Sequence, residues 1–300
     1  MKTLPVIGVD VGGTKILAAV VAPDGALEAR EERRTDVSSP ERLFAELDGV
    51  VEALRSQTEV AALGFGIPSL IDQRTGRALS SVNLPLEHVD FRERMRERHG
   101  LPVALDNDAN AAAIAEWRAG AARGSDDVVM LTLGTGVGGG LILGGKPYRG
   151  ATGAGAELGH VVVEYDGPPC PCGGRGHLES FASGTAADAV ARGLYGPASD
   201  AHELVRRGQS GESEAVAALA GIGRRLGAAI GSFVNTFEPE LIVIGGGFAA
   251  AGDLLLAPAR EDALREALPE LRDGIRIIRA ELGTDAGVVG AGMIAYEARG

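Results

Sequence analysis

The chain has 300 residues, of which 45% are apolar and 23% are charged, and its formal net charge at pH 7 is −12. This composition is typical of a globular protein, and the acidic balance disfavours nucleic acid or an anionic membrane as the main partner. No apolar run approaches the length of about 18 residues that a membrane helix needs, and the first strand is expected too near Met1 for a signal peptide. We therefore expect a cytoplasmic protein.

The first part of the sequence predicts three strands, followed by alternating helices and strands. Apolar side chains recur at helical spacing through residues 40–55, and short apolar runs mark the strands. We expect strands at 5–10, 16–22, 27–35, 61–66 and 101–105, and helices at 40–55, 91–99 and 109–121.

The pattern restarts at residue 127 with a strand, a glycine-rich turn over 134–139 and a returning strand at 140–143. Two such openings indicate an internal duplication. Further strands are expected at 241–244 and 275–278, and helices near 179–192, 214–237 and 286–298. We expect two lobes that share a hinge in or just after helix 109–121. Residues 1–116 with 286–300 would form the smaller lobe, and residues 117–285 the larger one.

Three glycine clusters follow strands: Asp10-Val11-Gly12-Gly13-Thr14, Gly134-Thr135-Gly136-Val137-Gly138-Gly139 and Gly245-Gly246-Gly247. Glycines let backbone N–H groups approach phosphate oxygens closely. The chain has only three lysines, Lys2, Lys15 and Lys146, so backbone and a metal would hold most of a phosphate charge. Asp10 could hold Mg²⁺ through water.

Other interpretations of these clusters are plain hairpins, a P-loop or a dinucleotide fingerprint. Gly13-Thr14-Lys15 has the wrong residue order for a P-loop, and both turns lead into a strand where either nucleotide motif needs a helix. The three clusters together favour a nucleotide enclosed by backbone from both lobes.

Asp106-Asn107-Asp108-Ala109-Asn110 lies where a predicted strand ends and an alanine-rich helix begins. Ligands of α/β sheets gather at strand carboxyl ends, so Asp108 is a candidate base. Asp108 could equally be a helix N-cap, which is compatible with catalysis because a helix N-terminus keeps a carboxylate ionised.

His160, Cys170, Cys172 and His177 supply two nitrogen and two sulfur ligands, a suitable set for tetrahedral zinc. Cys170 and Cys172 are the only cysteines. A disulfide between them or a loop without metal are the alternatives.

These motifs, with Glu157-Leu158-Gly159-His160 and Cys170-Pro171-Cys172-Gly173 through Glu179, resemble in order the ROK family of repressors, open reading frames and kinases. The resemblance covers nearly the whole chain and is nearest to the bacterial ATP-dependent glucokinases. It implies an actin-like (ribonuclease H-like) α/β fold of two lobes around a cleft, and a homodimer or homotetramer. It also implies transfer of the γ-phosphate of ATP to glucose, with Mg²⁺ and a structural zinc ion.

The resemblance also implies residue roles. Asp108 matches the catalytic base. The residues that match sugar contacts are Asn83, Asn107, Asp108, Glu157, His160 and Glu179. Those that match nucleotide and Mg²⁺ contacts are Asp10, Gly12, Gly13, Thr14, Lys15, Thr135, Gly136, Gly246 and Gly247. His177 departs from the family pattern, which usually has a third cysteine there.

Three alternatives stay open. The substrate could be N-acetylmannosamine, N-acetylglucosamine or another hexose, and the donor could be polyphosphate. A sugar-responsive repressor of the same family is the rival from another class, but such proteins carry an N-terminal helix-turn-helix domain for which the first strand leaves no room.

Overall fold

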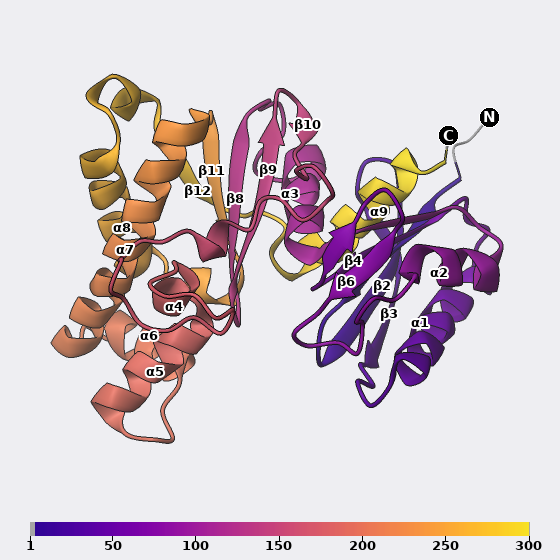
Figure 1. The fold of residues 1–300 in the computed structure, drawn as a ribbon, viewed down its shortest axis with the longest axis horizontal. Coiled ribbons are helices and arrows are strands. Elements are labelled where there is room, and N and C mark those ends of the chain that lie inside the picture. The colour runs from indigo at the N-terminus through magenta and orange to yellow at the C-terminus, as the bar shows by residue number, and fades with distance from the viewer. Residues whose placement is uncertain (1–3, 300) are drawn as a thin grey trace.

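The computed structural model describes residues 4–299, so Lys2 and the extreme ends of the predicted smaller lobe, residues 1–3 and 300, lie outside it. Two five-stranded sheets lie side by side, each with its own helices (Figure 1). The first half of the chain contains β1 (Val6–Val11), β2 (Lys15–Val21), β3 (Leu27–Arg34), α1 (Pro40–Arg55), β4 (Leu63–Ile67), β5 (Leu70–Asp72), β6 (Arg77–Ser80), α2 (Phe91–His99), β7 (Val103–Asn107) and α3 (Asp108–Ala119).

The second half begins with β8 (Val128–Leu133), β9 (Val137–Leu143) and β10 (Lys146–Pro147). The remaining elements are α4 (Glu179–Ala182), α5 (Gly184–Tyr195), α6 (Ala201–Gln209), α7 (Ser213–Phe237), β11 (Leu241–Gly245), α8 (Asp253–Glu266), β12 (Ile277–Arg279) and α9 (Ala286–Glu297). A long segment between β10 and β11, residues 148–240 and here called the excursion, contains helices α4 to α7 and precedes the last two strands of the sheet.

The two sheets have the same topology. Their strand orders are β3-β2-β1-β4-β7 and β10-β9-β8-β11-β12, which means third, second, first, fourth and fifth in both. In each sheet the first two strands form an antiparallel hairpin, and the fourth strand pairs parallel to the first. The internal duplication that the two turns predicted is therefore present in the fold.

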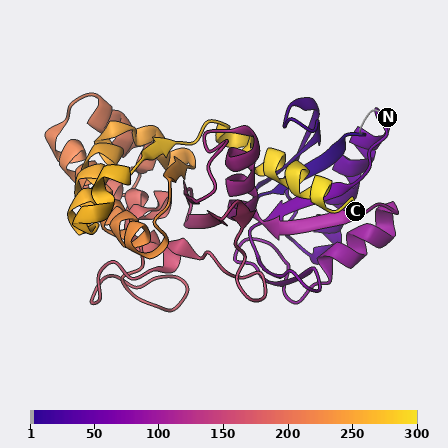
Figure 2. The same cartoon turned by 90° about the horizontal axis from the view of Figure 1, so that it is seen from above.

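Helices α3 and α9, which end the two halves, pack against each other between the sheets (Figure 2). Helix α9 packs on β1, β4 and β2 of the first sheet, whereas α3 packs mainly on β9 of the second. The approach to α9 is so close that a Cβ at Gly64 on β4 would collide with the carbonyl of Ala291. The division of the chain into lobes at residues 116 and 286 stays a prediction.

Two predicted segments are wrong in their extent. Strand β9 begins at Val137, so the second turn spans only Gly134–Gly136 and the following glycines belong to the strand. The helix expected at 179–192 is broken at Ser183, whose hydroxyl caps α5 by accepting a hydrogen bond from the N–H of Ala186 at 3.0 Å. The hairpin β5–β6 was not predicted at all.

Each sheet has a buried apolar core on its outer face, under α1 and α2 in the first half and under α7 and α8 in the second. Within residues 4–299, no helix combines the length and the apolar character needed to cross a bilayer.

Candidate active site

The carboxyl end of β7 carries the predicted base. Asn107, not Asp108, is the N-cap of α3: its Oδ1 accepts hydrogen bonds from the N–H groups of Ala109 at 2.9 Å and Asn110 at 3.2 Å. Asp108 is the first helical residue, and its Oδ1 accepts a further hydrogen bond from the N–H of Ala109 at 3.0 Å. The helix N-terminus still orients it.

Two half-buried carboxylates, those of Asp10 and Asp108, face this edge of the first sheet. Burial raises the pKa of Asp10 to about 7, with the nearby charge of Asp108 adding to the effect. Burial also raises the pKa of Asp108. Lys15 offsets the effect on Asp10 only partly, and its ammonium is paired with Glu32 on the neighbouring strand at 3.2 Å. Two carboxylates so poorly neutralised form a place where a cation would be stabilised.

The first glycine turn joins β1 to β2. Gly12 N–H donates to the carbonyl of Lys15 at 2.8 Å, and the buried Thr35 donates its hydroxyl to the carbonyl of Gly12 at 2.7 Å. Asn83 lies against the turn, since a Cβ added at Gly13 would be 3.1 Å from the Cβ of Asn83. Thr35 was missed by sequence reasoning, because a threonine at the end of a polar strand carries no signal of its own.

The second turn joins β8 to β9 and is held by the helices of the excursion. Gly184 N–H donates to the carbonyl of Gly134 at 2.7 Å, and Thr185 donates its hydroxyl to the carbonyl of Thr135 at 2.8 Å. Glu179 accepts a hydrogen bond from Val137 N–H at 2.9 Å. A carboxylate predicted to contact sugar is thus also a brace of the turn.

A cavity of about 600 Å³ opens beside this turn. Thr135 and Gly247 line it, together with Thr185, His202 and Arg206 from α5 and α6. The adjacent Gly246 has φ +84°, and a Cβ there would collide with the backbone of Leu133, so this position requires glycine. The excursion helices complete a cavity that the glycine motifs predicted only in part.

Glu157 lies within electrostatic range of Asp108, His160 and Glu179. Burial raises the pKa of Glu157, the charges of Asp108 and Glu179 add to this, and His160 opposes it. His160 Nε2 lies 3.9 Å from Glu157 Oε2. The structure therefore places the carboxylates of Asp108 and Glu179, from two other predicted motifs, near enough to Glu157 to affect its pKa.

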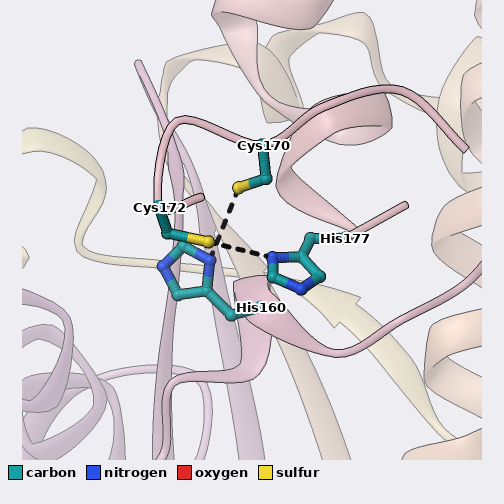
Figure 3. Close-up of side chains that lie close together, drawn as sticks. All are labelled: His160, Cys170, Cys172 and His177. Carbon is teal, nitrogen blue, oxygen red and sulfur yellow. Dashed lines mark hydrogen bonds between the residues drawn. The ribbon is translucent and has the colours of Figure 1, made fainter. Parts of the chain in front are cut away.

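The cysteine–histidine knuckle, residues 160–177, gathers its four predicted ligands (Figure 3). Cys170 Sγ lies 3.7 Å from Nδ1 of His160, and Cys172 Sγ lies 3.2 Å from Nδ1 of His177. All four ligand atoms lie within 4.8 Å of one another, and both cysteines are free thiols. Two sulfur and two nitrogen donors at this spacing fit a tetrahedral zinc ion.

The chain has clear relatives among known proteins. A profile described as the ROK family matches residues 6–298. The glucokinase of Thermotoga maritima is 35% identical, and the match covers 99% of each chain. The N-acetylmannosamine kinase of Shigella flexneri is 31% identical over 97% of this chain and 98% of its own.

The crystal structure of a ROK family glucokinase from Streptomyces griseus in complex with glucose and AMPPNP has a TM-score of 0.84 and 34% identity. It covers 98% of this chain and 99% of its own. The actin-like two-lobed fold expected from the resemblance is confirmed by this likeness and by the duplicated sheets.

Proposed function

The chain belongs to the ROK family, and from this premise we propose that it is an ATP-dependent hexose kinase that converts glucose and ATP to glucose 6-phosphate and ADP. The observation that carries the proposal is the gathering of Asp108, Glu157, His160 and Glu179 beside two glycine turns. We further propose that the reaction is cytoplasmic and that the enzyme is a homodimer or homotetramer, as the resemblance implies.

The nucleotide would lie across the second turn, with its nucleoside in the cavity of about 600 Å³. That cavity adjoins Thr135 and Gly247, so the phosphates would reach the N–H groups of the two glycine turns. A cavity of this size beside the turn supports a nucleotide over polyphosphate as the donor, because a linear polyanion needs no such cavity.

Asp108 would accept the proton of the sugar 6-hydroxyl. At the same time the hydroxyl oxygen would form a bond to the γ-phosphorus, and the bond between that phosphorus and the leaving ADP oxygen would break. Its raised pKa makes the carboxylate a stronger base than an exposed aspartate, while α3 keeps it oriented. Asn83, Asn107, Glu157, His160 and Glu179 would position the remaining hydroxyls. Phosphoryl transfer depends mainly on such positioning and on neutralised charge.

Asp10 would hold Mg²⁺ through water, and the residues around it fit a cation because the half-buried carboxylates of Asp10 and Asp108 lack adequate neutralisation. Mg²⁺ bound there would neutralise phosphate charge. Lys15 is the least supported of the predicted nucleotide contacts, because Glu32 already pairs with it.

His160, Cys170, Cys172 and His177 would hold zinc, which would fix the knuckle. His160 turns Nδ1 toward Cys170 and Nε2 toward Glu157. One ring nitrogen is thus available to the metal, and the other faces the predicted sugar site. Zinc would then orient a sugar-binding side chain without contacting the sugar.

A substrate screen tests the proposal. Glucose, mannose, N-acetylglucosamine and N-acetylmannosamine would each be supplied with ATP and Mg²⁺, and with polyphosphate as a control donor. We expect the highest kcat/KM for glucose with ATP, with glucose 6-phosphate as the product by NMR. A preference for an N-acetylated sugar would instead place the chain with the N-acetylmannosamine kinases.

A further inference from the structure

The segment from Tyr148 to Glu157, here called the strap, leaves the second sheet after β10 and leads to the predicted sugar residues Glu157 and His160. Two of its glycines have a positive φ, Gly150 at +71° and Gly153 at +117°. Tyr148 is 48% exposed. The strap contains no helix or strand, so contacts with other segments determine its position.

Those contacts are made to the first half of the chain. Gln73 N–H donates to the carbonyl of Thr152 at 2.7 Å, and Gln73 Nε2 donates to the carbonyl of Leu105 on β7 at 2.9 Å. A Cβ at Gly153 would lie 2.5 Å from the carbonyl oxygen of Ile71, so the two backbones are in close contact. The strap lies on the hairpin β5–β6 and is tied through Gln73 to the strand that precedes the base.

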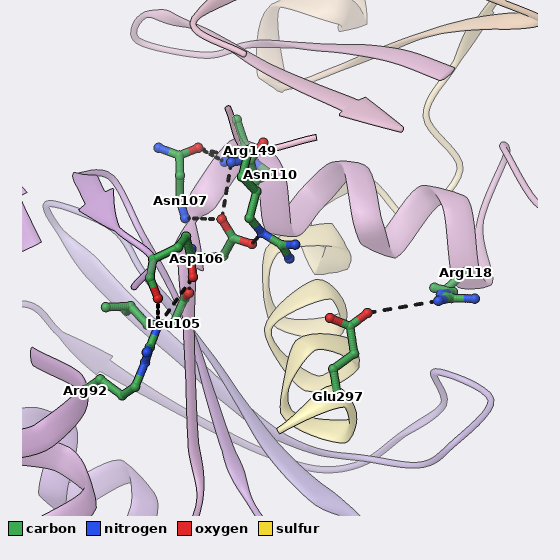
Figure 4. A network of polar contacts seen from close by, with 10 residues as sticks. Arg92, Leu105, Asp106, Asn107, Asn110, Arg118, Arg149 and Glu297 are labelled. Carbon is green, nitrogen blue, oxygen red and sulfur yellow. Dashed lines mark hydrogen bonds and ion pairs between the residues drawn. The ribbon is translucent and has the colours of Figure 1, made fainter. Parts of the chain in front are cut away.

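The shortest of these links is a partly buried ion pair. Arg149 Nε donates to Asp106 Oδ2 at 2.6 Å, and Asp106 is 1% exposed (Figure 4). The other oxygen, Oδ1, accepts hydrogen bonds from the N–H of Asn107 at 2.9 Å and from Nδ2 of Asn110 at 3.2 Å. A single carboxylate is shared by the strap and by the two residues that flank the base.

The charge balance makes this junction sensitive. Burial raises the pKa of Asp106, while Arg149, the N–H of Asn107 and Asn110 all favour the ionised form. Removing only Arg149 would leave a buried charge without its cation, which is far more costly than removing both partners.

From this geometry we infer that Asp106 and Arg149 are positioning residues for the sugar site: the pair holds the strap, and with it Glu157, in register with Asn107 and Asp108. The inference rests on the proposed function for its substrate but not for its structural content. Neither residue was among the predicted site residues, because the strap crosses between the halves only in the folded chain.

Three variants separate positioning from stability: Arg149→Met, Asp106→Asn and the double variant. In Arg149→Met the Asp106 carboxylate is left without its cation, so this variant should unfold at a lower urea concentration than wild type. The double variant has no such charge and should unfold at nearly the wild-type concentration.

Loss of a charge-assisted hydrogen bond should raise the KM for sugar by about tenfold in all three. The KM for ATP should change little. Arg96→Met is the matched control, since its ion pair with Glu93 at 2.6 Å is half-exposed and lies within α2.

Hydrogen–deuterium exchange provides a readout that needs no activity. Gly155 N–H donates to the carbonyl of Arg149 at 2.9 Å, and this amide should exchange faster in the double variant than in wild type. Unchanged exchange across 148–157, or a wild-type KM for sugar in a well-folded double variant, would overturn the inference. Absence of hexose phosphorylation by the wild-type protein would overturn the proposed function alone.

Discussion

The two glycine turns occupy equivalent places in the duplicated sheets, yet their surroundings differ. Each turn has three residues, Gly12–Thr14 and Gly134–Gly136, between the first and second strands. The first turn lies beside the half-buried carboxylates of Asp10 and Asp108. The second lies beside the cavity of about 600 Å³ and is braced by hydrogen bonds from α5 and to Glu179.

This difference indicates that the two halves have different roles although their sheets share one topology. The half with uncompensated negative charge is suited to the metal, the attacking hydroxyl and its base. The half with the braced turn is suited to a nucleotide, and Glu179 links its turn to the knuckle. Variants that remove charge beside the first turn, or contacts that hold the second turn, test this difference.

Replacement of the base should have the largest effect. Asp108→Asn keeps the size and the helix position of the side chain but cannot accept a proton. We expect kcat to fall by about 100-fold or more, with KM for sugar nearly unchanged. Steady-state kinetics with glucose measure the change, and circular dichroism checks the fold. Near-normal kcat in a folded variant would remove Asp108 from the mechanism.

Loss of a zinc ligand should have the next largest effect, and it acts on the second turn. His177→Ala should lower zinc affinity by about tenfold or more and raise the KM for sugar, because His160 and Glu179 lose their fixed positions. His177→Cys should keep the metal. Elemental analysis of the purified protein measures occupancy, and we expect one zinc per chain in wild type.

Arg175→Ala is the matched control for this test, since Arg175 is exposed in the same knuckle. It should retain both zinc and the KM for sugar. Full zinc occupancy and an unchanged KM in His177→Ala would show that the knuckle does not use His177 as a ligand.

The sequence was most informative where local physics decides the outcome. The helices 40–55 and 91–99 were predicted at their observed bounds, because apolar spacing and turn residues fix them. The knuckle ligands were predicted as a set, because four donors in 18 residues can meet only by local folding. The strand–turn–strand repeat likewise predicted the duplication.

What could not be predicted depends on contacts between distant segments. The Asp106 carboxylate contacts both Arg149, 43 positions away in the sequence, and Asn110, 4 positions away. No periodicity in the sequence indicates the contact with Arg149. The cavity wall from α5 and α6 lies more than 40 residues from the turn it serves. The break at Ser183 was missed because a serine cap inside an otherwise helical pattern looks like an ordinary helix residue.

The charge at the first turn should appear as a pH dependence of stability in the protein without nucleotide or metal. The pKa of Asp10 is about 7 in the folded protein, against an ordinary value of 3.8. The folded state therefore binds this proton more tightly than the unfolded state does. The stabilisation is complete below about pH 4 and is lost as the pH rises through about 7.

Asp10→Asn replaces the carboxyl with an amide that does not titrate, so the variant should gain stability relative to wild type as the pH rises. One pKa unit corresponds to about 1.4 kcal/mol, so the gain in free energy of unfolding between pH 5 and pH 8 should be about 2 to 3 kcal/mol. Urea unfolding at both pH values measures it. Asp273→Asn, at an exposed position, should show no such gain. A constant difference between Asp10→Asn and wild type across this range would mean that the Asp10 carboxylate is not an uncompensated charge in the folded protein. The contrast between the two turns would then rest on the braces of the second alone.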